Sequence, residues 1–240
     1  MKGLVIKQAD TTEGNRIVWI ITSEYGVIKA SGRGALKVRG KNGAGSQFLT
    51  YAEFELFQGK ELHNINSAEP IESFIPIHES ITKLALASYF CEAVYRHMGL
   101  NNPDNDIYRL LLNCIHTLAY KDFPEKAVKA VFEARFTADI GYRPVLDCCI
   151  ECGDMHSQKA FDIEKGGILC GSCAKGDTLI SKSAINAWRY ICDCDAGKIF
   201  SFEADDECIG ILEKVTEKYL EFHSGIQLKS LDYYKTVKLH

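Results

Sequence analysis

The sequence contains no run of eighteen apolar residues, so no segment is expected to cross a membrane as a helix. The first residues become polar at Lys7, too soon to hold the apolar core of a signal peptide. Repeats and low-complexity tracts are also missing. These absences favour a globular protein that stays in the cytoplasm, where its ten cysteines remain reduced.

Recognisable catalytic motifs are missing as well. The chain has no nucleophile elbow and no His-Glu-x-x-His, and its seven histidines show no paired metal spacing. No His-x-Glu precedes a Pro-Cys-x-x-Cys, which disfavours a zinc deaminase. A phosphate-binding loop is excluded because five residues separate Gly34 from Gly40, and Asn42 rather than Ser or Thr follows Lys41. The sequence therefore predicts a protein that is not an enzyme.

Acidic residues are absent from one stretch of an otherwise acidic chain. The 240 residues carry a formal net charge of −4, yet residues 29–41 hold five cations and no acid. Such a segment predicts a localised site for a polyanion, although a solvated loop that binds nothing is an alternative. The nearby aromatic residues Tyr25, Phe48 and Tyr51 are more typical of a core than of a base-stacking surface. The candidate contacts are Lys29, Arg33, Lys37, Arg39 and Lys41, with Arg16 on a neighbouring predicted strand.

The most specific signal is a pair of Cys-x-x-Cys motifs separated by seventeen residues. Each motif places two thiolates on one tight turn, and two such turns supply the four ligands of a tetrahedral zinc ion. Gly153 and Gly171 stand where the turns need a residue without a Cβ. Four protein ligands leave no open position, so the pattern predicts one structural zinc ion rather than a catalytic one. The predicted ligands are Cys149, Cys152, Cys170 and Cys173.

Three further cysteines are weaker candidates. Cys148 could replace Cys149 as a ligand, but its spacing to Cys152 fits the turn less well. Cys192 and Cys194 are typical of small buried residues or helix ends.

The hydrophobic pattern changes along the chain. Up to about residue 75 it predicts five short strands, with a turn at Glu24-Tyr25-Gly26 and apolar–acidic alternation over residues 48–57. Five strands predict a small closed barrel of the OB type, with a β-sandwich as the alternative. After Pro76 apolar residues recur at helical spacing. The predicted fold is α+β: an OB-type barrel at residues 1–77, a helical bundle at 78–146 and 179–240, and an inserted four-cysteine zinc ribbon at 147–178.

This order of parts resembles the bacterial RecO family of DNA repair proteins, and local motifs agree. The most specific match is Gly-Tyr-Arg-Pro-Val-Leu-Asp, which runs into the first cysteine turn and Gly153. The resemblance covers essentially the whole chain. Its motifs are residues 24–35 (EYGVIKASGRGA), 59–65 (GKELHNI) followed by Ala68-Glu69, 141–147 (GYRPVLD) and Gly166-Gly167.

The resemblance implies a recombination mediator rather than an enzyme. Proteins of this family bind single- and double-stranded DNA, anneal complementary strands and act on the bacterial nucleoid during repair. They join RecR, engage the acidic tail of the single-strand-binding protein, and so help RecA load onto coated strands. The basic segment would then contact phosphates without reading sequence. The cations Lys126, Lys129 and Arg135 share one predicted helix and are candidates for the rim of a groove that binds the acidic tail, with a solvated helix face as the alternative.

Two other classes of function stay open at this stage. One is a protein–protein adaptor that works through its zinc ribbon and has no DNA activity of its own. The other is a thiol or metal enzyme in which Cys149 and Cys152 form a redox pair.

Overall fold

The computed structural model describes residues 1–12, 14–32, 42–59, 62–176 and 178–238. These residues form two compact units, one made of the described residues within 1–120 and 228–238 and the other of those within 121–227. The basic cluster of the sequence, apart from Arg16 and Lys29, lies outside the described residues. In the described part of the chain, no helix combines the length and apolar character needed to cross a membrane.

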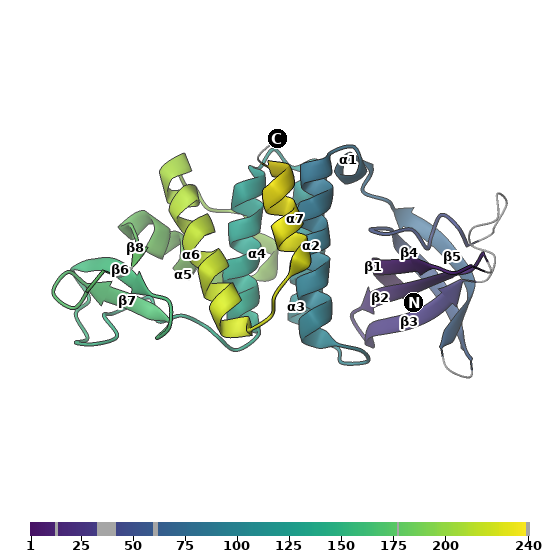
Figure 1. Ribbon diagram of the computed structural model, residues 1–240, viewed down its shortest axis with the longest axis horizontal. Coiled ribbons are helices and arrows are strands. Elements are labelled where there is room, and N and C mark those ends of the chain that lie inside the picture. Colours follow the sequence, from purple (N-terminus) through teal and green to yellow (C-terminus); the bar gives the residue numbers. More distant parts are fainter. Residues whose placement is uncertain (13, 33–41, 60–61, 177, 239–240) are drawn as a thin grey trace. The chain divides into compact units, whose positions relative to one another are not determined.

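The first unit begins with a closed five-stranded barrel (Figure 1), as the sequence predicts. The barrel closes through a parallel pairing of β3 with β5, in which Ala30 lies opposite His63. The other neighbouring strands pair antiparallel, in the order β1-β2-β3-β5-β4, which is typical of an OB-type barrel. The strands are β1 (Lys2–Asp10), β2 (Arg16–Thr22), β3 (Gly26–Gly32), β4 (Tyr51–Gln58) and β5 (His63–Glu72).

Alternating side chains fill the inside of this barrel. Along β4, Ala52 and Phe54 are buried while Glu53 and Glu55 face solvent, so the predicted alternation is confirmed. Burying a side chain of the size of Phe54 contributes roughly 1.5–3 kcal/mol to folding. The buried cluster comprises Val5, Val18, Ile20, Ala30, Ala52, Phe54, Ile65 and Ala68.

The predicted turn before β3 also joins the barrel to the helices of its own unit. Gly26 has φ +65°, and a Cβ there would lie 2.4 Å from the carbonyl oxygen of Asn102. The next residue, Val27, accepts a hydrogen bond of 3.0 Å from the backbone N–H of Asn101. Only glycine permits this close approach, because any side chain would push the α2–α3 connection away.

Seven α-helices follow the barrel in the described residues. Side chains of Ser80, Ser181 and Asp205 cap the helices α2, α5 and α6 by accepting a backbone N–H. The helices are α1 (Ile75–His78), α2 (Ile81–Met98), α3 (Asn105–Tyr120), α4 (Glu125–Asp139), α5 (Lys182–Asp193), α6 (Asp206–Ser224) and α7 (Lys229–Lys238), with a 3₁₀ turn at Ala196–Lys198.

The helices are divided between the two units. The last helix, α7, returns to the first unit and lies alongside α2 (Figure 1). There Glu92 of α2 accepts hydrogen bonds from the backbone N–H and the hydroxyl of Ser230. Helices α4, α5 and α6 belong to the second unit. This division does not coincide with the boundaries expected at residues 77, 146 and 178, which stay predictions.

The second unit contains the cysteine module, whose small sheet packs on two helices. Strand order is β7-β6-β8, with β6 (Gln158–Asp162) in the middle, β7 (Gly167–Cys170) and β8 (Thr178–Leu179). Phe161 of β6 contacts Trp188 of α5 and Tyr219 of α6, with ring centroids 4.8 and 5.3 Å apart. All three rings are buried. The module is therefore held to α5 and α6 by an aromatic core of its own unit.

Candidate metal centre and nucleic-acid interface

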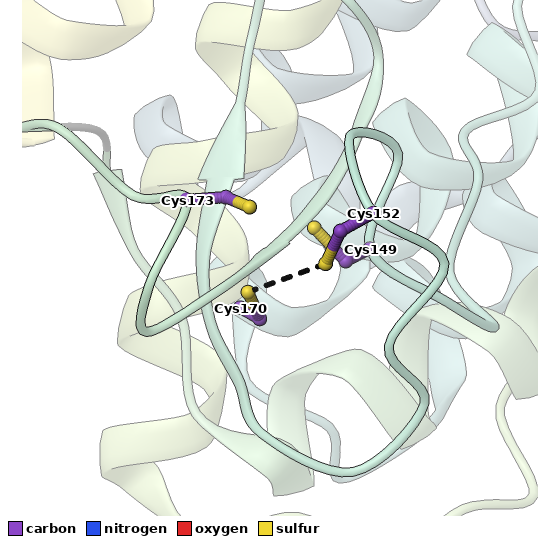
Figure 2. A group of neighbouring side chains, drawn as sticks. All are labelled: Cys149, Cys152, Cys170 and Cys173. Carbon is purple, nitrogen blue, oxygen red and sulfur yellow. Dashed lines mark hydrogen bonds between the residues drawn. The ribbon is translucent and has the colours of Figure 1, made fainter.

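The four predicted zinc ligands lie together. Figure 2 shows the sulfur atoms of both Cys-x-x-Cys turns around one common space. All four Sγ atoms lie within 4.8 Å of one another, and those of Cys152 and Cys170 are 3.7 Å apart. A tetrahedral ion with Zn–S bonds of about 2.3 Å requires sulfur atoms about 3.8 Å apart. The donor set and its spacing therefore fit a tetrahedral thiolate-bound metal. The clustered cysteines are Cys149, Cys152, Cys170 and Cys173.

Local backbone hydrogen bonds hold each turn in shape. Gly153 donates its N–H to the carbonyl of Cys149 at 2.8 Å, and its φ of +75° explains why a glycine follows the first pair. Ala174 donates to the carbonyl of Cys170 at 3.0 Å in the second turn. These turns direct the two sulfurs of each pair to the same side.

Backbone N–H groups also stabilise negative charge on two of the sulfurs. Burial opposes ionisation of Cys149, but N–H groups of Cys170, Cys152 and Glu151 lower its pKa to about 6. The N–H of Cys173 is the main cause of the lowered pKa of Cys170. The thiols of Cys170 and Cys152 hydrogen-bond to Cys173 and raise its pKa to about 12. A divalent cation would stabilise all four thiolates together.

The three weaker cysteine candidates stand apart from this group. Cys148 is half-buried and does not belong to the cluster. Cys192 is buried, and burial raises the pKa of its thiol to about 12. Cys194 is half-buried at the C-terminal end of α5. Neither of these two is a ligand of the four-cysteine centre.

Two arginines outside the predicted sites tie the cysteine module to α5. Arg143, from the Gly-Tyr-Arg-Pro motif, pairs with Asp193 and donates to the carbonyl of Cys192 at 3.3 Å. Arg189 of α5 pairs with Asp147 at 2.8 Å and donates to the carbonyl of Leu146. We call these two ion pairs the clamp of the cysteine module. The only sequence signal for it is the Gly-Tyr-Arg-Pro motif, which precedes the first cysteine turn.

The predicted nucleic-acid contacts are only partly described. Lys29 lies half-buried on β3, with its ammonium 5.2 Å from the centroid of the Trp19 ring. Arg16 is buried, and its guanidinium binds both carboxylate oxygens of Asp10, at 2.6 and 3.2 Å. The guanidinium of Arg16 is thus already engaged within the barrel, and we leave it out of the interface proposed below. The other candidates, Arg33, Lys37, Arg39 and Lys41, lie outside the described residues.

The aromatic residues near the basic segment differ in exposure. Tyr25 is 53% exposed at the β2–β3 turn, although the sequence favoured a core position. Phe48 is half-buried, and Tyr51 accepts a hydrogen bond of 3.4 Å from the hydroxyl of Tyr108. Tyr25 is therefore the most accessible of the three for stacking.

The expectation that three cations of α4 form one rim is wrong. Lys129 is only 1% exposed, and its ammonium lies 2.8 Å from Glu133 and 2.6 Å from Glu217 of α6. Burial disfavours its charge, but the two carboxylates raise the pKa of Lys129 above its ordinary value. Arg135 donates to the carbonyl of Cys194 at 2.7 Å and pairs with Asp139. Helix α4 packs on α6, so this face of α4 is interior and not a peptide-binding rim.

The described residues define a protein that joins a closed five-stranded barrel to a helical region with a cluster of four cysteines that could hold a metal ion. The family described as "Recombination protein O N terminal" matches residues 1–74, and "Recombination protein O C terminal" matches residues 78–232. The chain belongs to the recombination protein O (RecO) family.

Relatives match over almost the full length. A DNA repair protein RecO of Acetivibrio thermocellus is 33% identical over 239 residues, covering 98% of this chain and 95% of that protein. The protein of the same name from Caldicellulosiruptor saccharolyticus is 29% identical, covering 99% and 98%. Another from Listeria monocytogenes is 25% identical, covering 95% and 91%. The similarity therefore extends over both units and is not confined to the cysteine module.

Proposed function

We propose that the chain is a recombination mediator in DNA repair. In this proposal it binds single- and double-stranded DNA, anneals complementary strands and, with RecR, helps load RecA onto strands coated by single-strand-binding protein. The observation that carries it is the family match over residues 1–74 and 78–232, together with relatives named for DNA repair. Such a protein works beside the bacterial nucleoid, in the cytoplasm.

The proposed chemistry requires charge neutralisation and no catalysis. Annealing brings two polyanions together without making or breaking a covalent bond, so cations that contact phosphates suffice. We assign these contacts to Lys29 and to the basic segment that continues to Lys41. The four-cysteine centre holds one zinc ion as a structural element, because the buried cluster of Cys149, Ala160, Leu169 and Cys170 is small for a module of this size.

The acidic tail of the single-strand-binding protein is a further proposed partner, through a site other than the buried face of α4. Of the three cations of α4, Lys126 is the most accessible, with a side chain that is 32% exposed and pairs with Asp206. The resemblance alone supports this partner.

A zinc-module adaptor without DNA activity is the alternative function. It is distinguished by titrating labelled single-stranded and duplex oligonucleotides of unrelated sequence with the full chain. A mediator binds both, with similar affinity for unrelated sequences and with an affinity that falls steeply as salt rises. Absence of binding to either oligonucleotide at low salt would instead support the adaptor.

A further inference from the structure

A groove of about 700 Å³ lies between β1 and α2 of the first unit. We call it the β1–α2 groove. Its volume falls within the range of roughly 300–1,000 Å³ that small-molecule sites occupy, so it can admit a nucleotide. The side chains that matter here are Lys7, Gln8, Phe48, Glu92, Tyr95 and Arg96.

Lys7 brings an ammonium group to this groove without an acidic partner. Its Nζ lies 4.7 Å from the centroid of Trp19 and 4.9 Å from that of Tyr95. Lys29, on the strand at the other side of β2, lies 5.2 Å from the same Trp19 ring. Among the described residues no carboxylate forms an ion pair with Lys7 or Lys29. The aromatic faces stabilise the cations, but they leave the N–H donors available to an anion.

Among the described residues that line the groove, Glu92 is the one carboxylate, and it is already engaged. Glu92 accepts hydrogen bonds from the backbone N–H of Ser230 at 3.0 Å and from its hydroxyl at 2.5 Å. Arg96 lies 3.7 Å from Glu92 with its side chain 52% exposed. These two charges offset each other, so Lys7 leaves the groove with an excess of positive charge.

Aromatic and amide groups stand beside these cations. Phe48 is half-buried, and its backbone N–H donates to the side-chain oxygen of Gln8 at 2.7 Å. This bond fixes the Gln8 carboxamide and leaves its NH₂ group as a donor. A cation next to aromatic rings is the combination that holds unpaired nucleotides, because the phosphate meets the charge and the base stacks.

We propose that the β1–α2 groove binds single-stranded nucleic acid, with a phosphate at Lys7 and Arg96 and a base against Phe48 and Tyr95. The inference rests on the proposed DNA-binding function and adds a site outside the basic segment. Duplex DNA does not fit, because its bases are stacked inside the helix.

The test measures the fluorescence of Trp19, whose ring contacts the Lys7 ammonium. Trp19 and Trp188 are the two tryptophans of the chain, and Trp188→Phe leaves Trp19 as the only reporter. We expect an oligothymidylate to change Trp19 fluorescence, with saturation at the concentration that saturates binding. A duplex of the same length is expected to produce no such change. Because Trp188 is fully buried, replacing it is expected to disturb the fold. The second measurement therefore keeps Trp188 intact and follows the fluorescence anisotropy of a labelled oligothymidylate.

The charge variants use the same anisotropy assay. Lys7→Gln combined with Arg96→Gln is expected to weaken single-strand binding about tenfold. The slope of log K against log salt should fall by about 1.4, or 0.7 for each phosphate contact. Lys2→Gln is the matched control, because Lys2 is an exposed lysine of the same strand and does not line the groove. It should change neither value.

The outcomes separate this inference from the proposed function. If the double variant binds like the wild type while neutralising Lys37, Arg39 and Lys41 abolishes binding, the groove is not a site and the mediator proposal stands. If the wild type binds no oligonucleotide, both fail. A change of Trp19 fluorescence with an acidic peptide but not with oligothymidylate would also overturn the inference, and would assign the groove to a protein partner.

Discussion

The Sγ atoms of Cys152 and Cys170 lie 3.7 Å apart, although the two residues come from different Cys-x-x-Cys turns. This distance is nearly twice the S–S bond length of about 2.05 Å in a disulfide, and it matches the edge of a zinc–thiolate tetrahedron. The relationship favours a metal centre over the Cys149–Cys152 redox pair that the sequence left open, because a redox pair needs one turn only, whereas here the sulfur atoms of both turns lie within 4.8 Å of one another.

The full chain, purified without chelator, is expected to contain one zinc ion. Cys149→Ala should lose the metal and destabilise the cysteine module by several kcal/mol, because metal-binding energy is folding energy for such a unit. Cys148→Ala is the matched control, since this neighbouring cysteine is outside the cluster and its loss should leave the zinc in place. Elemental analysis and thiol titration measure both variants. A wild-type zinc content near zero, or zinc lost only from the Cys148 variant, would contradict the assignment.

Removing one partner of the buried Lys129–Glu133 ion pair should lower the stability of the second unit. Lys129→Ala leaves Glu133, which has no exposed surface, without its cation. We expect a loss of about 3–5 kcal/mol in the free energy of unfolding. Lys126→Ala on the same helix is the control, because its pair with the exposed Asp206 should contribute less than about 1 kcal/mol. Equal effects of the two variants in urea titrations would show that Lys129 is not buried as described.

The junction between β5 and α1 should make stability depend on pH at the acid end. The hydroxyl of Tyr120 and the N–H groups of Phe74 and Ser73 lower the pKa of Glu72 from its ordinary value of 4.5. Because the folded-state pKa is lowered, the contribution of this charge to stability is complete above the ordinary value of 4.5, and it is lost as the pH falls from there through the folded-state pKa.

Glu72→Gln should therefore reduce stability by about 1 kcal/mol at pH 7 and by progressively less as the pH falls below 4.5. Glu69→Gln, an exposed position on the same strand, should have little effect at either pH. A Glu72 variant whose destabilisation is the same at pH 7 and at acid pH would refute this role of the charge.

Neutralising Lys37, Arg39 and Lys41 together tests the basic segment. The variant removes up to three phosphate contacts, so the salt slope for single strands should fall by about 0.7 per lost contact. Affinity should drop alike for unrelated sequences, because phosphate contacts carry no base information. Zinc content and thermal stability serve as controls and should not change. Unchanged affinity and slope would remove this segment from the interface.

Local patterns made the barrel and the cysteine centre predictable. Alternation at Ala52 and Phe54 and the turn at Gly26 are properties of a few neighbouring residues, and ligand spacing is visible in the sequence itself. The burial of Lys129 was not visible, because it depends on Glu217, which lies far along the chain on α6. The return of α7 to α2 likewise depends on a contact between distant segments, made by Glu92 and Ser230.

The clamp of the cysteine module escaped sequence reasoning for a similar reason. Arg143 and Arg189 are ordinary surface cations in the sequence, and their role follows only from partners on α5 and on the segment before the first cysteine. The groove beside Lys7 requires β1 and α2 to lie next to each other, which strand periodicity and helix periodicity do not specify.

The most direct test of a recombination mediator is the annealing of complementary oligonucleotides, first bare and then coated with single-strand-binding protein. The wild-type chain is expected to accelerate annealing in both cases, and the variant neutralised at Lys37, Arg39 and Lys41 to accelerate it less. Annealing at the protein-free rate on bare strands, and no annealing of coated strands, would contradict the assignment of this chain as a mediator.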